Sequence, residues 1–186
     1  SGTLTLPSGS TTVNLDVILG HDAKYETNET FGVTISGPTN ATIAAASAVG
    51  TVLNDDSVPD LTIDDVTLAE GTGGSGTSTA VLTVTQSAVS ALNTIVQYAT
   101  ADVTATAADS DYVAASGTLT IPAGSTPATV SVTSNHDAAY ESDETLHLVL
   151  SSPTNANLVD NTGLVTLTND DTPPTISIAN VTLTEG

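Results

Sequence analysis

The chain repeats itself over most of its length, and this repeat sets the size of the unit that can fold. A shift of 115 residues brings Ser1 onto Ser116 and Gly71 onto Gly186, and nearly half of the aligned positions are identical without a gap. The acidic phrase HDAKYETNET at residues 21–30 then meets HDAAYESDET at residues 136–145. Because one period has the length of one domain, the sequence predicts a tandem array of domains.

Proline-bearing segments mark the joints of this array. SVPD follows Asp56 and TPPT follows Asp171, and proline stiffens a short linker by fixing its backbone angles. We therefore expect a complete domain over 57–171, the C-terminal half of a preceding repeat over 1–56, and the first strand of a following repeat over 172–186. Both ends of the chain are expected to lie inside domains of a longer array.

Each period contains short runs in which apolar and polar residues alternate, and turns rich in Gly, Pro, Asn and Asp separate them. Period-two alternation is typical of half-buried strands, and no helical period occurs. The runs lie at 61–63, 66–68, 80–85, 94–98, 118–122, 129–133, 145–151 and 163–168. The pattern predicts an all-β fold of tandem antiparallel Ig-like β-sandwiches, each of which is about seven-stranded.

Charge and composition exclude several classes of partner. One Lys or Arg stands against 21 acidic residues, which gives a formal net charge of −20. Nucleic acid and anionic membranes attract cationic surfaces, so neither is an expected partner. The apolar runs are far shorter than the about 20 residues of a membrane-spanning helix, and we expect no membrane insertion. The chain has no Cys, which excludes disulfides and thiolate metal sites.

Acidic residues follow several of the predicted strands. In an antiparallel sandwich the loops after alternate strands gather at one end, so these segments can converge there. Ca²⁺ takes six to eight oxygen ligands, and a Cys-free, His-poor site is unpromising for zinc or copper. The candidate ligands of the complete domain are Glu70, Asp102, Asp137, Glu141, Glu144, Asp170 and Asp171.

The order of motifs resembles one known family. YATADVTATAADSDYVAASGTLTIPAGS is followed by HDAAYESDET, LSSPTNA and TNDD, and this series is similar to the Calx-beta domain family. The resemblance implies a seven-stranded sandwich with several Ca²⁺ ions at the end where the chain leaves the domain. Carried over by position, it implies the same seven acidic ligands and adds the carbonyl of Ala139. The corresponding residues of the flanking repeats are Asp22, Glu26, Glu29, Asp55 and Asp56 before the complete domain, and Glu185 after it.

Three positions depart from the family pattern. His136 and Asn169 stand where tightly binding members have acids, and Val103 replaces the usual Gly after Asp102. Fewer carboxylates imply fewer or weaker ions, so we expect one to three in place of a four-ion cluster.

Other interpretations of the same residues remain open. The acidic turns could be solvated turns without metal, since Asp and Asn bond nearby backbone amides at strand ends. EGTGGSGTST at 70–79 has no P-loop lysine and no following helix, so a flexible strand-to-strand loop is the better interpretation. Paired carboxylates occur in glycosidases, but the acids here recur or sit at strand ends and aromatic sugar platforms are nearly absent. The sequence predicts no enzyme.

The leading functional hypothesis is a calcium-binding structural or adhesive array of a secreted or cell-surface protein, in which Ca²⁺ stiffens the joints between domains. Two alternatives remain: a calcium sensor, or adhesin repeats that bind a glycan or a protein. The expected partners are neighbouring repeats of the same chain. Residues 1–56 lack the strands that would cover Leu4, Leu15 and Phe31, so either a longer parent chain covers them or other copies donate strands in a fibre.

Overall fold

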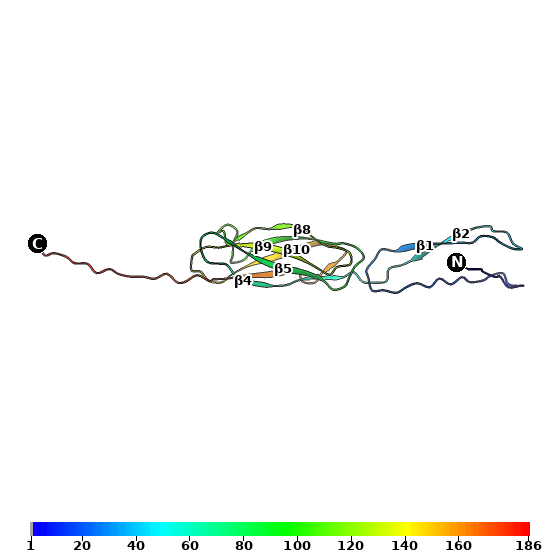
Figure 1. Cartoon of the computed structure of the whole chain (residues 1–186), viewed down its shortest axis with the longest axis horizontal. Helices are drawn as coiled ribbons and strands as arrows, with labels where there is room; N and C mark the ends of the chain where they lie inside the picture. The colour runs from blue at the N-terminus through cyan, green and yellow to red at the C-terminus, as the bar shows by residue number, and fades with distance from the viewer. Residues whose placement is uncertain (1) are drawn as a thin grey trace.

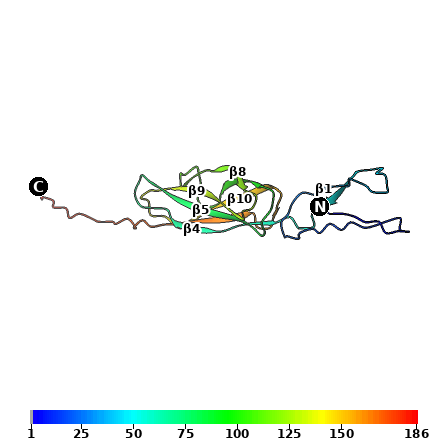
Figure 2. The ribbon, with the colours of Figure 1, turned by 45° about the vertical axis from the view of Figure 1, so that its right-hand side comes forward.

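The computed structural model describes residues 2–186, and this range contains strands but no helix. The molecule is elongated: a hairpin lies toward one end, a β-sandwich in the middle, and an extended C-terminal segment at the other end (Figure 1). The turned view in Figure 2 keeps the same order along the long axis. Among the described residues, no helix is long and apolar enough to cross a membrane. The expected all-β sandwich is confirmed.

The sandwich consists of two five-stranded sheets. The first sheet has the strand order β4 (Val66–Ala69), β12 (Thr162–Thr168), β10 (Glu144–Thr154), β6 (Thr94–Asp102) and β8 (Ser116–Ile121). The second has the order β11 (Asn157–Leu158), β3 (Asp60–Ile63), β5 (Thr77–Gln86), β9 (Pro127–Asn135) and β7 (Tyr112–Val113).

Two pairings differ from the purely antiparallel arrangement that the strand pattern predicted. β4 runs parallel to β12, and the short β11 runs parallel to β3, while the other pairs are antiparallel. Alternation along a strand does not reveal the direction of its partner, so the sequence pattern could not distinguish these cases. The parallel β4–β12 pair matters for the site, because it brings the C-terminal ends of both strands to the same edge.

The connection between β3 and β4 crosses from one sheet to the other through two adjacent aspartates. The Asp64 carboxylate accepts a hydrogen bond from the Thr83 amide of β5 (2.6 Å), and the Asp65 carboxylate accepts one from the Leu164 amide of β12 (2.7 Å). Each aspartate thus ties the crossing to a different sheet. Gly163 of β12 leaves room for the crossing, since a Cβ there would lie 2.7 Å from the Asp64 carbonyl oxygen.

The core between the sheets is aliphatic. Leu61, Leu82 and Val132 from one sheet and Leu146, Leu148 and Val165 from the other are at most 2% exposed. Tyr112 is the buried aromatic residue among those described, at 3% exposed. Packing of this kind fixes the sheets against each other and holds the loops at each end in place.

Residues 2–56 contain one hairpin, formed by β1 (Glu29–Thr34) and β2 (Ser47–Val52). The apolar residues that were expected to lack covering strands are half-buried or exposed. Phe31 and Val33 are half-buried. The side chains of Leu4, Leu6, Leu15, Val17 and Ile35 are each about half exposed, between 45% and 55%. These residues of the preceding repeat therefore expose apolar side chains whose counterparts are buried in the complete sandwich.

We predict that Gly163→Ala destabilises the sandwich by about 1–3 kcal/mol, because the added methyl group overpacks the crossing between the sheets. Gly74→Ala is the matched control, since a Cβ there meets nothing within 4 Å. Urea denaturation of both variants measures the difference. Equal midpoints for the two variants would contradict the close packing of the crossing against β12.

Candidate metal centre

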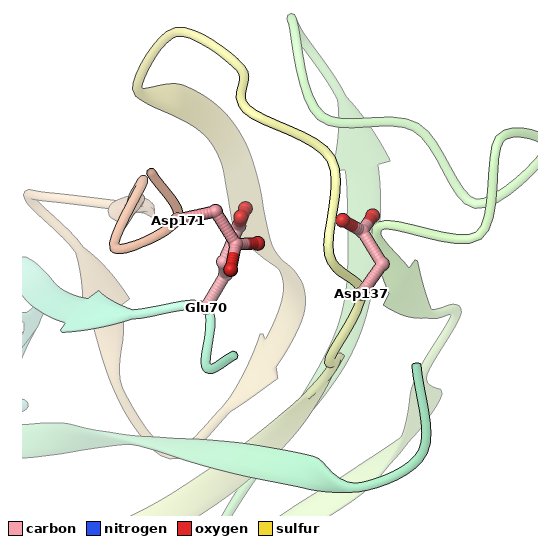
Figure 3. A group of neighbouring side chains, drawn as sticks. All are labelled: Glu70, Asp137 and Asp171. Atoms are coloured by element: carbon pink, nitrogen blue, oxygen red, sulfur yellow. The ribbon is translucent and has the colours of Figure 1, made fainter. Parts of the chain in front are cut away.

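Acidic side chains from four segments gather at one end of the sandwich. Glu70 follows β4, Asp171 follows β12 by three residues, and the 136–143 loop joins β9 to β10 at the same end. Asp111, just before β7, is the fourth contributor. Figure 3 shows Glu70, Asp137 and Asp171 at the junction of three of these segments. The predicted convergence at one end therefore occurs for the segments that carry these residues.

The first group consists of Glu70, Asp137 and Asp171, whose nearest carboxylate oxygens lie within 4.8 Å of one another. Glu70 is buried, with 8% of its surface exposed, and Asp171 is half-buried. Glu70 Oε1 and Asp171 Oδ2 are buried and have no hydrogen-bond partner among the described residues. Two buried acceptors without a donor are costly, and a bound cation would satisfy both.

The second group consists of Asp111, Glu141 and Glu144, also within 4.8 Å of one another and all half-buried. Asp111 is not among the ligands that the sequence motifs indicated. Its position is fixed by two backbone contacts, because the Thr106 amide donates to its carboxylate (2.6 Å) and its carbonyl accepts from the Asn135 amide (3.0 Å). Asp111 is the acid of the tripeptide SDY. It precedes a strand of only two residues, which the alternation of apolar and polar residues could not reveal.

The ionisation of these carboxyl groups reflects their crowding. Burial, followed by the charges of Asp137 and Glu141, raises the pKa of Glu70 to about 7. Burial and then contact with Asp111 raise the pKa of Glu144 to about 7. Burial also raises the pKa of Glu141, with further contributions from Asp137 of the first group and Asp111 of the second. The two groups therefore act on each other as one acidic centre.

Asn169 holds the two sides of this centre together. Its side-chain oxygen accepts a hydrogen bond from the Glu141 amide (3.1 Å), and its side-chain nitrogen donates to the Asp171 carbonyl (3.2 Å). Its own amide donates to the Asp143 carboxylate (3.1 Å). By comparison with the family pattern, Asn169 stands in place of a carboxylate. In the structure its amide group positions two segments that carry acids, a role for which it needs both a donor and an acceptor.

His136 has a similar positioning role. Its ring shares a hydrogen bond with the Ser78 hydroxyl (2.9 Å) and packs on Gly71 and Gly76, where an added Cβ would lie 2.4 Å and 2.6 Å from ring atoms. The Gly73 amide donates to the Asp137 carbonyl (2.6 Å). The glycine-rich segment that the sequence suggested was a flexible connection thus wraps closely around the start of the acidic loop.

The other predicted ligands lie around the two groups. The Asp102 carboxylate accepts hydrogen bonds from the Tyr112 hydroxyl (2.5 Å) and the Ala107 amide (3.1 Å), and the hydroxyl bond lowers its pKa. Asp170 is exposed and accepts from the Gly71 amide (3.2 Å), while Ala139 is exposed and its amide donates to Asp137 (2.7 Å). None of these three belongs to either group, and their roles as ligands remain predictions.

The preceding repeat has a related but looser arrangement. Asn54 repeats the contacts of Asn169, because it accepts from the Glu26 amide (3.0 Å) and donates to the Asp56 carbonyl (2.9 Å). A hollow of about 420 Å³ is lined by Lys24 and by the expected acids, namely Asp22, Glu26, Glu29, Asp55 and Asp56. No three of its acids come within 4.8 Å of one another in the described residues. Glu185 lies exposed in the extended C-terminal segment.

The donor set of the complete domain suits a hard divalent cation. Six carboxylates converge there, and Lys24, the single Lys or Arg of the chain, belongs to the preceding repeat. Carboxylate oxygens are the preferred ligands of Ca²⁺ and Mg²⁺. The unpartnered oxygens of Glu70 and Asp171 fit such an ion, because it would provide the positive charge that the surrounding protein lacks.

The fold and the site define a β-sandwich module with an acidic centre at its exit end. The model of the Calx-beta domain family matches residues 1–67 and 54–173. The chain therefore belongs to the Calx-beta domain family, as the sequence motifs indicated. Among curated protein sequences, none matches the chain significantly.

Solved structures share the fold. A crystal structure of CBD12 from CALX1.2 aligns with a TM-score of 0.53 and 24% identity over 60% of this chain and 44% of its own length. The apo form of the Calx CBD1 domain aligns with a TM-score of 0.52 and 23% identity over 62% of this chain and 100% of its own. The calcium binding domain CBD12 of CALX1.1 aligns with a TM-score of 0.53 and 24% identity over 60% of this chain and 46% of its own length. This chain thus spans less than half of either CBD12 structure.

We predict that the metal-free chain loses stability as the pH rises from about 4.5 to about 7. Glu70 and Glu144 have a pKa of 4.5 in the absence of these surroundings and about 7 in the fold. The folded state therefore binds more protons than the unfolded state within this window, and its advantage disappears as the pH increases. The expected loss is on the order of 1–3 kcal/mol after allowance for solvent screening.

Denaturation in metal-depleted buffer at pH 5 and pH 8 measures this loss. Glu70→Gln is the matched variant, since it keeps the shape of the side chain but cannot ionise, and it should flatten the dependence. The prediction would be contradicted if the stability of the metal-free wild type, relative to that of Glu70→Gln, increased from pH 5 to pH 8.

Proposed function

We propose that the chain is a non-enzymatic, calcium-binding module whose complete domain holds Ca²⁺ in the acidic centre. The observation that carries this proposal is the pair of buried, unpartnered oxygens of Glu70 and Asp171 within reach of Asp137. Membership of the Calx-beta family supports it, as does the fold shared with a solved structure described as a calcium binding domain.

Each acidic group has the size expected for one ion. Glu70, Asp137 and Asp171 would hold the first ion, and Asp111, Glu141 and Glu144 the second. Two ions lie within the range of one to three expected from the sequence. Asp102, Asp170 and Ala139 are further candidate ligands, through water or after small movements of their loops. Waters and carbonyl groups complete the shell in sites of this kind.

We further propose that the module belongs to a structural or adhesive array on the cell surface or in the extracellular space, with neighbouring repeats as its partners. The internal repeat and the end-to-end layout in Figure 1 support an array. An extracellular strut needs only weak sites, because extracellular modules work with dissociation constants of about 10⁻⁴–10⁻³ M.

A contact at the joint explains how calcium could stiffen the array. The carbonyl of Tyr25, within the acidic loop of the preceding repeat, accepts hydrogen bonds from the Ser90 hydroxyl (3.2 Å) and the Ala91 amide (3.0 Å) of the complete domain. Ser90 is fully buried, and Tyr25 and Ser90 form a parallel bridge. An ion that orders the loop around Asp22 and Glu26 would therefore also order a contact to the next domain.

The same contact favours a sensor as the second candidate. In a sensor the loop would change its contact with Ser90 when the calcium concentration changes, and the angle between domains would report it. Affinity separates the two functions, because a sensor needs a dissociation constant near the level of a fluctuating signal, about 10⁻⁷–10⁻⁵ M for cytosolic calcium.

We predict that Glu70→Gln and Asp137→Asn each weaken calcium binding by at least about tenfold, since each removes one charge from the first group. Isothermal titration calorimetry of the chain in metal-free buffer measures the affinity. Asp160→Asn is the matched control, because it removes the same charge from an exposed residue before β12, at the opposite end of that strand. Wild-type chain that shows no calcium binding up to 10 mM, or equal losses in all three variants, would refute the proposal.

We also predict that millimolar calcium lengthens the chain in solution and narrows its range of shapes. Small-angle scattering at low protein concentration, with calcium or with EDTA, measures the maximum dimension. Ser90→Ala should reduce this response, because it removes a donor to Tyr25, whereas Ser131→Ala on the exposed face of β9 should not. Identical scattering of the wild type with calcium and with EDTA would show that the joint is indifferent to metal.

A further inference from the structure

The complete domain is attached to the rest of the chain at opposite ends of the long axis. The linker before the domain leads into β3 and β4 at the entry end, and the chain leaves after β12 at the exit end. Figures 1 and 2 show polypeptide continuing beyond both ends of the sandwich along that axis. A pull on the chain therefore reaches the domain through β3 and β4 on one side and through β12 on the other.

β4 and β12 connect these two attachments within one sheet. Val66 pairs with Val165 and Ala69 pairs with Thr168, and the parallel strands both run toward the exit end. A pull on the two linkers draws β4 back toward the entry end and draws β12 out of the exit end. The strands are thus loaded in opposite directions along their own axes. Because the hydrogen bonds of a ladder run between the strands, this load acts on all of them at once, in shear.

Further contacts extend the pairing beyond both ends of β4. Before the strand, the Asp65 carboxylate accepts a hydrogen bond from the Leu164 amide of β12 (2.7 Å). After the strand, the Glu70 amide donates to the Thr168 carbonyl (3.1 Å). The Thr168 hydroxyl also donates to the Leu68 carbonyl (3.3 Å). The contact that would bear a pull in shear is therefore longer than the four residues of β4.

β8 forms the other edge of the same sheet and offers an internal comparison. β4 and β8 each pair with one neighbour in that sheet. Each also carries a leucine that packs in the core, namely Leu68 in β4 and Leu119 in β8. β8 lies between β7 and β9 in the chain and is attached to neither linker. The contacts of β8 therefore contribute to folding stability without lying between the two points where a pull enters.

We propose that the β4–β12 pairing is a force-bearing clamp, which resists extension of the domain between its two linkers. This is a mechanical function, in addition to the binding of an ion. The alternative route for a load is an antiparallel hairpin opened from one end, in which the pairs break one after another. In the clamp they must break together, so the domain stays folded for longer under the same force.

A cation in the first acidic group would reinforce this clamp at the end where the C-terminal pull arrives. Glu70 directly follows β4, and Asp171 follows β12 by three residues. Glu70 Oε1 and Asp171 Oδ2 are buried and have no hydrogen-bond partner within residues 2–186. An ion held by both carboxylates would join the two strands directly. This reinforcement rests on the function proposed above, whereas the clamp itself does not.

The direction of pulling tests the clamp. The chain has no Cys of its own, so handles can be attached to the full-length chain at chosen residues. Ser57→Cys with Thr172→Cys loads β4 against β12 in shear. Gly74→Cys with Thr172→Cys loads the exit end alone, where the two strands would separate one pair at a time. Gly74 suits this purpose, because an added Cβ there meets nothing within 4 Å.

Optical tweezers measure the unfolding rate at a fixed force for both attachments in EDTA. We expect unfolding to be at least about tenfold slower in shear, since forced unfolding is governed by the unfolding rate constant and several contacts must break together. Equal rates for the two attachments, or slower unfolding from the exit end, would overturn the proposal.

Two leucine variants separate mechanical stability from equilibrium stability. In urea, Leu119→Ala should destabilise the chain at least as much as Leu68→Ala, because Leu119 is buried and Leu68 is half-buried. In shear the order should reverse: Leu68→Ala should raise the unfolding rate by at least about tenfold, and Leu119→Ala by much less. If the rates under force instead follow the losses measured in urea, β4 bears no special share of the load and the proposal fails.

The same measurements in millimolar calcium test the reinforcement. Calcium should slow unfolding in shear further, because an ion bound only by the intact site stabilises that site. Glu70→Gln should lose most of this gain, whereas Asp160→Asn, which changes an exposed residue before β12, should keep it. Calorimetry on the same chain separates the two proposals. Absence of calcium binding would refute the proposed function and leave the clamp, while binding without slower unfolding would refute the reinforcement.

Discussion

The parallel pairing of β4 with β12 is the contact on which the rest of this structure depends. It places Glu70 and Asp171 at the same edge of one sheet, although about 100 residues separate them in the chain. The pairing is possible because Asp64 and Asp65 carry the chain from one sheet to the other. The aliphatic core holds these strands and so keeps the acidic groups at their ends close together. Burial, followed by the charges of the neighbouring carboxylates, raises the pKa of Glu70 to about 7.

The sequence allowed the fold to be predicted almost fully, because alternation, turns and a self-match all agree on a sandwich of fixed size. The sequence also indicated Glu70, Asp137 and Asp171 as candidate ligands, since each lies at the end of a strand or follows one. It could not indicate which acids would meet. Asp102, for example, belongs to neither group of close acids. Its carboxylate accepts a hydrogen bond from the Tyr112 hydroxyl, a contact between side chains ten residues apart that depends on how one loop folds, and its role as a ligand stays a prediction.

The residues that depart from the family pattern have structural roles that their chemical type alone does not reveal. If only carboxylates are counted, His136 and Asn169 each remove one ligand from a metal site. In the structure, the first fixes the glycine-rich segment beside Glu70, and the second ties Glu141 to the end of β12. An amide can donate and accept at once, and an imidazole packs on two glycines where a carboxylate would be too small. His136 and Asn169 add no negative charge, yet they fix the positions of the acidic segments. The repulsion among carboxylates that an ion must offset is therefore lower.

The same reasoning connects the acidic centre with the joint between domains. The loop that carries the acids of one repeat also contains the tyrosine whose carbonyl contacts the next domain, so order in the loop is shared by both contacts. In the complete domain, the corresponding Tyr140 is 55% exposed. A loop that is held from only one side can still bind an ion, but the ordering of the loop then costs more of the binding energy. If the acidic loops bind calcium as proposed, a docked neighbour should therefore improve the site of the repeat before it.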